Sequence, residues 1–130
     1  MDCNMDKPIS SLMQRNLTVV DIDDAIEKVE AVLNSSHLSY VPVVDSEGKC
    51  FGVISAPDLM HFHRKGQNPK ARHAWEVCTH KVIEASPDAS LNEVVELMVN
   101  NHIHHLVITD KQSMLGIVSS IDLINECVLK

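Results

Sequence analysis

The sequence predicts a mixed α/β (α+β) fold built from two βαββα units. Three observations predict it: the chain contains an internal repeat, each half has one amphipathic helix, and a pair of short β-branched runs follows each helix. A shift of 65 residues aligns Asp23 with Asp88, and a shift of 64 aligns Gly52 with Gly116. Because a single unit leaves one face of its sheet uncovered, we expect the units to pack sheet to sheet with pseudo-twofold symmetry.

The pattern within each half supports the elements in order. A short strand comes first. Apolar residues spaced by three and four positions predict helices around 26–33 and 91–98, and Ser90 with Glu93 forms a capping-box start for the second helix. A short helix closes each unit. β-Branched runs separated by polar turns predict one hairpin in each half, at 41–44 with 51–54 and at 106–109 with 115–118.

These elements divide the chain into a tail, two repeats that form one compact module, and a connector. Gly66 and Pro69 are typical of a loop, and Trp75 is expected to pack in the core after it. The boundaries that we predict are 1–8 for the N-terminal tail, 9–64 for repeat 1, 65–73 for the connector and 74–130 for repeat 2. Four basic residues at the connector favour either a surface for polyphosphate or an acidic partner, or a solvated loop: Arg64, Lys65, Lys70 and Arg72.

Composition disfavours several classes of function. The chain has 130 residues, a net charge of −7 and 3% aromatic residues, so we expect no nucleic-acid partner. No apolar run is long enough for a membrane span, and the acidic N-terminus lacks the apolar stretch of a secretory signal. The four cysteines form no C-x-x-C pair. Two disulfides are the alternative, but a chain of this length folds without them, so we expect reduced thiols and a cytoplasmic location.

The best-matched stretch of the repeat places a serine three residues before an aspartate at a predicted strand-to-helix turn. It reads Gly-Val-Ile-Ser-Ala-Pro-Asp at 52–58 and Gly-Ile-Val-Ser-Ser-Ile-Asp at 116–122. Free N–H groups at a helix start and a serine hydroxyl bind an anion, a nearby carboxylate accepts hydrogen bonds from vicinal hydroxyls, and glycine allows close backbone approach. Phosphate donors beside a ribose acceptor indicate a nucleotide. Simple helix N-caps explain the same residues, and this alternative stays open.

These stretches resemble the signature of the CBS domain, the repeat of the cystathionine β-synthase type. The resemblance covers the chain from about Ile9 to Cys127. It implies a tandem pair, or Bateman module, with two pseudo-symmetric clefts between the repeats. Such modules usually bind adenosine-type ligands and often form dimers, so an adenine nucleotide and a homodimer are expected. The stretches that carry the resemblance are 40–45, 52–59, 106–110 and 116–123, together with the strand-to-helix entry at 82–88.

Carried over position by position, the resemblance assigns roles to residues in both halves. It implies ribose contacts for Asp58 and Asp122, and phosphate contacts for Ser55 and Ser119. The residues implied for the adenine slot are Thr18, Val20, Tyr40 and Pro42 in one cleft, and Ile83, Ala85, His105 and Val107 in the other. The second copy departs from the family pattern, because Val107 stands where the first copy has its proline.

Eight histidines are a high count for this length, and the densest group lies at 102–105. The resemblance implies phosphate contacts for the pair His104 and His105, stronger where imidazole is charged; an ordinary solvated strand edge is the alternative. Zinc could be considered at the 102–105 group, or at His61 and His63 with a third histidine, His73. A spacing of two suits a strand, but on the helix expected at 61–63 the rings point apart, so no metal is expected.

We therefore predict a stand-alone regulatory module without catalysis. It would bind AMP, ADP or ATP, or else S-adenosylmethionine or NAD, between the repeats, and a change of shape or oligomeric state would signal to an unidentified partner protein. The alternative is a dimerisation or docking module for an enzyme or transporter that binds no nucleotide. A hydrolase using Ser119, a neighbouring histidine and Asp122 is disfavoured because no glycine-rich nucleophile turn is present. No catalytic cofactor and no membrane partner are expected.

Overall fold

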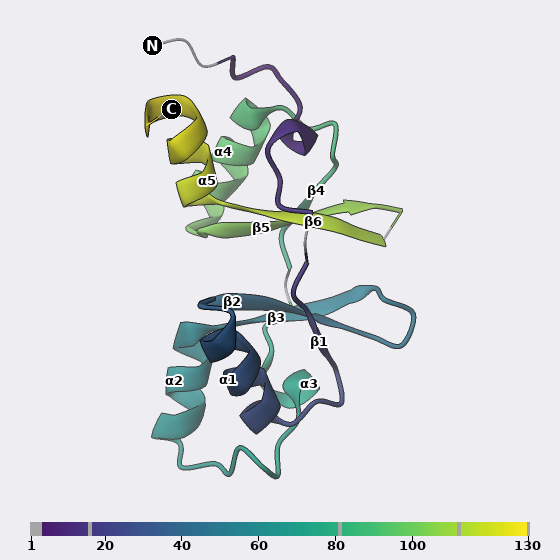
Figure 1. Cartoon of the computed structure of the whole chain (residues 1–130), viewed down its shortest axis with the longest axis vertical. Coiled ribbons are helices and arrows are strands. Elements are labelled where there is room, and N and C mark those ends of the chain that lie inside the picture. Colours follow the sequence, from purple (N-terminus) through teal and green to yellow (C-terminus); the bar gives the residue numbers. More distant parts are fainter. Residues whose placement is uncertain (1–3, 16, 81, 112, 130) are drawn as a thin grey trace. The chain divides into compact units, whose positions relative to one another are not determined.

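The computed structural model describes residues 4–15, 17–80, 82–111 and 113–129 (Figure 1). The chain divides into two compact units. The repeat-1 unit is Thr18–Val82, and the repeat-2 unit combines Met1–Leu17 with Ile83–Lys130. The chain thus starts in the repeat-2 unit, builds the whole of the repeat-1 unit, and then returns. Each unit is described by itself below.

The repeat-1 unit contains a three-stranded sheet covered by helices on one face. Strand β1 pairs in parallel with β2, which pairs antiparallel with β3. The parallel pairing requires a crossover, and helix α1 supplies it. The elements are β1 (Val20–Asp21), α1 (Ile26–Ser35), β2 (Tyr40–Val44), β3 (Cys50–Ser55), α2 (Ala56–Arg64) and α3 (Ala74–Val77).

The repeat-2 unit has the same sheet order, with β4 parallel to β5 and β5 antiparallel to β6. The predicted order of strand, helix, hairpin and closing helix is therefore confirmed in both halves. Its elements are a 3₁₀ turn (Ile9–Ser11), β4 (Glu84–Ala85), α4 (Leu91–Asn101), β5 (His105–Asp110), β6 (Ser113–Ser119), α5 (Ser120–Ile124) and a final π-helical segment (Asn125–Leu129).

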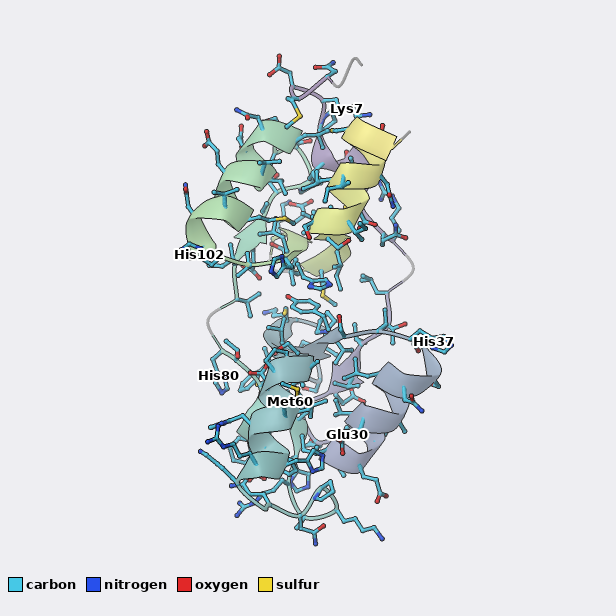
Figure 2. The ribbon with its side chains drawn as sticks, turned by 90° about the vertical axis from the view of Figure 1, so that its left-hand side faces the viewer. Lys7, Glu30, His37, Met60, His80 and His102 are labelled. Atoms are coloured by element: carbon cyan, nitrogen blue, oxygen red, sulfur yellow. The ribbon has the colours of Figure 1, made fainter. Side chains whose placement is uncertain are left out.

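Local sequence explains where the crossover helices begin and end. Ser90 Oγ accepts a hydrogen bond of 3.1 Å from Glu93 N, which confirms the predicted cap of α4. The aligned histidines His37 and His102 both have a φ of 54°, the left-handed conformation that ends a helix. Figure 2 labels both at the carboxyl ends of α1 and α4. The spacing of 65 residues between them therefore reflects a shared helix stop.

Each sheet buries one face against its helices. Val41, Val43 and Ile54 belong to the core of the repeat-1 unit and are fully buried. Leu106, Ile108 and Val118 take the same places in the repeat-2 unit. Because successive strand residues alternate between faces, the residues between them point to the face opposite the helices. That opposite face carries most of the predicted site.

The segments that lead into each repeat pack in the other repeat's unit. Gln14 exchanges two backbone hydrogen bonds with Ile117 on β6, and Thr79 exchanges two with Val53 on β3. Positions 14 and 79 are related by the same shift of 65. Ile9 and Ala74, the matching residues at the start of the two segments, are both fully buried. Residues 9–14 thus complete the repeat-2 unit, and residues 74–79 complete the repeat-1 unit. Residues 9–14 and 74–79 are called the leader segments of repeat 1 and repeat 2.

Two expectations about single residues are wrong. Trp75 is 47% exposed, because α3 buries Ala74 and Cys78 in the core instead. Cys50 and Cys78 are not in disulfides, but Cys127 is disulfide-bonded, so reduced thiols throughout were not the correct expectation. The final helical segment contacts the turn near the N-terminus, where Cys127 Sγ lies 3.9 Å from Met5 Sδ. Cys3 lies outside the described residues.

In the described part of the chain, every helix is too short or too polar to cross a membrane.

Candidate functional site

The repeated Ser-x-x-Asp motif forms a capping box at the start of each closing helix. Ser55 N donates to Asp58 Oδ2 at 2.9 Å, and Ser119 N donates to Asp122 Oδ2 at 2.9 Å. Asp122 N also donates to Ser119 Oγ at 3.1 Å. The N-cap interpretation is therefore confirmed in both copies. Since a carboxylate has two oxygens and capping engages Oδ2, Oδ1 keeps its lone pairs for another donor.

The two copies differ at the aspartate. Ser55 Oγ donates to Asp58 Oδ2 at 2.9 Å, and Thr79 Oγ1 donates to Asp58 Oδ1 at 3.4 Å. Thr79 belongs to the leader segment of repeat 2, and its counterpart by the repeat is Gln14. The motif itself gives no sign of Thr79, because no local sequence pattern relates position 79 to position 58. Hydroxyl donors thus already reach both oxygens of Asp58.

Strand register places the slot residues of β2 beside the motif. Tyr40 is paired with Ser55, and Pro42 with Val53. Directly opposed residues of an antiparallel pair share a face, so Tyr40 and Pro42 lie on the same face as Ser55, away from the helices. Three of the residues predicted for the site in repeat 1, Ser55, Tyr40 and Pro42, therefore share one face of its sheet.

The repeat-2 unit has the same arrangement with different side chains. His105 is paired with Ser119, and Val107 with Ile117. His104 is exposed on the segment just before β5, and its carbonyl accepts a 2.8 Å hydrogen bond from Ser120 N at the start of α5. The histidine pair therefore adjoins the Ser119 motif.

The slot residues predicted on the first strand of each unit do not share the face of those on the second strand. Val20 is paired with Val43 and belongs to the core on the helix side of its sheet. Ala85 is paired with Ile108, and it packs with Ile83 against the other core. A residue in register with a core residue points to the helices, so these side chains are turned from the face that holds Pro42 and Val107. Thr18, which precedes β1, is half-buried.

Burial changes the titration of the two residues opposite the serines. It raises the pKa of the Tyr40 hydroxyl far above its usual range, with a smaller contribution from the charge of Cys50. Burial lowers the pKa of His105, and the charge of His104 lowers it further, whereas Asp122 opposes the shift. Tyr40 is therefore a neutral donor. His105 is neutral at neutral pH.

The glycine of each motif leaves room for the backbone of the leader segment that packs over it. A Cβ on Gly52 would lie 2.6 Å from the Thr79 carbonyl oxygen, and a Cβ on Gly116 would lie 2.8 Å from that of Gln14. Neither distance is compatible with a side chain. The close backbone approach that glycine was expected to allow is thus made in each unit by the leader that pairs with its last strand.

Two of the histidines considered for zinc, His63 and His73, lie beside carboxylates. His63 Nε2 lies 2.6 Å from Glu30 Oε2, and His73 Nδ1 lies 3.1 Å from Glu76 Oε1. Hydrogen bonds from Arg72 and then His73 lower the pKa of Glu76. Among the residues that the structure describes, no group of three or more His, Cys, Asp and Glu side chains is placed to hold a metal ion.

Comparison with known proteins identifies the class of this fold and site. A family model described as CBS domain matches residues 9–65 and again residues 74–128. The chain therefore belongs to the CBS domain family, and it carries two copies of the domain. The family explains why the two units share sheet order, capping boxes and helix stops.

Three similar proteins are informative. The chain is 28% identical to inosine-5′-monophosphate dehydrogenase of Halobacterium salinarum over 107 residues, which is 82% of this chain and 21% of that protein. A CBS domain pair in complex with 5′-methylthioadenosine and S-adenosyl-L-methionine superposes with a TM-score of 0.79 at 24% identity, covering 90% of this chain and 92% of that one. CBSX2 in complex with AMP gives a TM-score of 0.83 at 16% identity, covering 92% and 94%.

Proposed function

We propose that this CBS domain pair is a regulatory module that binds an adenosine-type nucleotide. Binding changes its shape or oligomeric state, and a partner protein responds to that change. The observation that carries the proposal is the Ser-x-x-Asp turn, which occurs twice and in which the cap engages Oδ2 of each aspartate. The complexes of similar CBS pairs with AMP and with S-adenosyl-L-methionine support the ligand class.

Each proposed half-site combines three kinds of contact. Asp58 and Asp122 accept hydrogen bonds from ribose hydroxyls through Oδ1. Ser55 and Ser119, at the first turn of α2 and α5, lie near phosphate, where helix N–H groups favour an anion. Apolar residues contact the adenine ring, and the candidates on the face opposite the helices are Tyr40 and Pro42 in repeat 1 and Val107 in repeat 2, with Thr18 before the first strand of repeat 1.

The two half-sites should differ in affinity. A ribose must displace the 3.4 Å contact between Thr79 and Asp58, whereas Asp122 has His105 beside it. We therefore place the tighter nucleotide site at Asp122, with His104 and His105 toward the phosphate. No catalytic step is assigned to these residues, since they supply a binding surface.

The regulated partner is proposed to be an enzyme or transporter. The chain matches only about a fifth of the dehydrogenase of Halobacterium salinarum, so the similar region is one part of a larger enzyme there. The proposed assembly is a homodimer. The alternative, a docking module without a ligand, is favoured by the capping boxes, which account for both aspartates without a nucleotide.

Calorimetric titration separates the two functions. The wild-type chain is titrated with AMP, ATP, S-adenosylmethionine and NAD, and AMP with its bare ribose and phosphate is the reference ligand. Asp122→Asn retains a side-chain oxygen for the cap but removes the charge, and we expect it to weaken AMP binding about tenfold or more. Asp88→Asn, an exposed turn position, is the matched control and should bind as wild type. Absence of heat for all four ligands would leave the docking function.

A further inference from the structure

The closing helix of the repeat-2 unit is anchored differently from that of the repeat-1 unit. Helix α2 is one regular α-helix, and Phe62 in its second turn is 2% exposed in the core. A shift of 64 places Glu126 at the position of Phe62. Helix α5 is shorter and is followed by the π-helical segment Asn125–Leu129, in which Glu126 is half-buried. The end of repeat 2 therefore carries a charged residue where repeat 1 has a buried aromatic anchor.

Contacts with the N-terminal segment, residues 4–8, hold the end of the chain instead. Lys7 Nζ lies 2.6 Å from Glu126 Oε1, and Figure 2 shows Lys7 beside the final helical segment. The side chains of Lys7 and Glu126 are only 32% and 21% exposed, so solvent screens this ion pair less than one on the open surface. In the next residue, Cys127 Sγ lies 3.9 Å from Met5 Sδ.

The same N-terminal segment caps helix α4. Leu91 N donates to the carbonyl oxygen of Lys7 at 3.1 Å, and Asn92 N donates to that of Met5 at 3.0 Å. These N–H groups belong to the first turn of the helix, where no partner exists within the helix itself. Displacement of the N-terminal segment would therefore leave the first turn of α4 without two of its backbone hydrogen bonds.

A disulfide bond lies at this junction. Cys127 is disulfide-bonded, whereas Cys50 and Cys78 are free. The one cysteine that remains in the sequence is Cys3, which lies outside the described residues and two positions before Met5. Cys127 is half-buried rather than enclosed in the core, so a thiolate can reach the bond, and accessible disulfides are the ones that exchange readily.

We propose that the disulfide of Cys127, formed with Cys3, is a redox-sensitive latch that holds the N-terminal segment on the repeat-2 unit and so keeps the first turn of α4 capped. In the reduced chain, the ion pair between Lys7 and Glu126 and the backbone hydrogen bonds hold the segment without a covalent bond, and it opens more often. The repeat-2 unit thus responds to the thiol–disulfide balance, and the repeat-1 unit, with its free cysteines, does not. This inference is independent of the proposed nucleotide.

A dithiol is the reductant that this step requires. One thiolate of the dithiol attacks a sulfur of the bond and displaces the other cysteine as a thiolate, and the second thiol of the dithiol then attacks the mixed disulfide. The two cysteines gain two electrons and two protons and become thiols, and the dithiol leaves as its own disulfide.

Amide hydrogen exchange of the full-length chain, followed by NMR in the air-oxidised state and in dithiothreitol, tests the latch. In the reduced chain, the amides of Leu91 and Asn92 should exchange about tenfold faster or more, because the segment that accepts their hydrogen bonds opens more often. The matched amides of α1, Ile26 and Glu27, donate to connector carbonyls at 2.9 and 3.0 Å. They should change little, since no disulfide holds the connector.

Variants and peptide mapping complete the test. Cys127→Ser should show the fast exchange at Leu91 with or without dithiothreitol, whereas Cys50→Ser, which removes a free thiol on β3, is the control and should respond as wild type. Digestion of the oxidised chain without reductant should recover Cys3 linked to Cys127. A different linkage, including one between two chains, would overturn the latch, and so would equal exchange at Leu91 in oxidised and reduced wild-type protein.

Discussion

Gly52 lies directly beneath the carbonyl oxygen of Thr79, so closely that an added Cβ would stand 2.6 Å from it. Two backbone hydrogen bonds of 2.8 and 3.0 Å between Thr79 and Val53 hold that carbonyl in place. The contact fastens the leader of repeat 2 onto the sheet of repeat 1. It explains the recurrence of glycine at this position of the repeat, because Gly116 has the same relationship to Gln14.

Gly52→Ala should destabilise the chain by about 1–3 kcal/mol, because overpacking displaces a hydrogen-bonded backbone rather than a flexible side chain. The free energy of unfolding in urea measures the loss. The double variant Gly52→Ala with Cys78→Ala removes the sulfur that lies 2.8 Å from the new Cβ. In the Cys78→Ala background, Gly52→Ala should still lower the free energy of unfolding, although by less than it does in the wild-type chain. Full recovery would mean that the sulfur, and not the leader backbone, requires the glycine.

Ile9→Ala should destabilise the repeat-2 unit, although position 9 is the first residue of repeat 1 in the sequence. Ile9 is fully buried in the core that contains Leu106 and Val118, and truncation of a buried isoleucine costs about 2–5 kcal/mol. Hydrogen exchange should lose protection in β5 and β6 but not in β2 and β3. Val29→Ala, in the other core, is the matched variant and should give the reverse pattern. Loss of protection in β2 and β3 for Ile9→Ala would contradict the division of units.

Ser119→Ala should lower stability by about 0.5–2 kcal/mol through loss of the N-cap, whether or not a nucleotide binds. The side chain accepts the 3.1 Å hydrogen bond from Asp122 N, which alanine cannot accept. Ser119→Thr retains the hydroxyl and should lie close to wild type in urea unfolding. If threonine is as destabilising as alanine, the hydroxyl has no capping role.

The free energy of unfolding should fall as pH decreases below about 6.5, with a contribution from His105. Burial and the charge of His104 hold the pKa of His105 below its ordinary 6.5 in the folded state. The unfolded chain therefore takes up this proton first, and stability is lost between the ordinary pKa and the lower folded one. Urea unfolding between about pH 7.5 and 5 should show a smaller slope for His105→Gln than for wild type. His61→Gln, an exposed position on α2, is the control; equal slopes for His105→Gln and wild type would exclude this role.

Features specified by neighbouring residues could be predicted from the sequence. The cap of α4 at Ser90, the two hairpins and the Ser-x-x-Asp turns each depend on residues a few positions apart. The repeat itself then predicted that both halves share one fold. The capping box could also be predicted from the sequence, because a serine and an aspartate three residues apart are enough to form one.

Features that depend on distant residues could not be predicted in this way. Thr79 reaches Asp58 only because the leader pairs with β3, and no local pattern encodes that pairing. Trp75 was expected in the core, but the small Ala74 takes the buried position of α3. The orientation of Val20 followed from its register with Val43, which the sequence does not specify for so short a strand.

The most direct measurement of the central claim, that an aspartate carboxylate at the start of a closing helix binds ribose hydroxyls, compares AMP with 2′-deoxy-AMP by calorimetry. The wild-type chain should bind AMP about tenfold more tightly, because the deoxy ligand lacks one donor to a charged acceptor. In the double variant Asp58→Asn with Asp122→Asn the difference between the two ligands should disappear. Equal affinity of the wild-type chain for both ligands would contradict the claim.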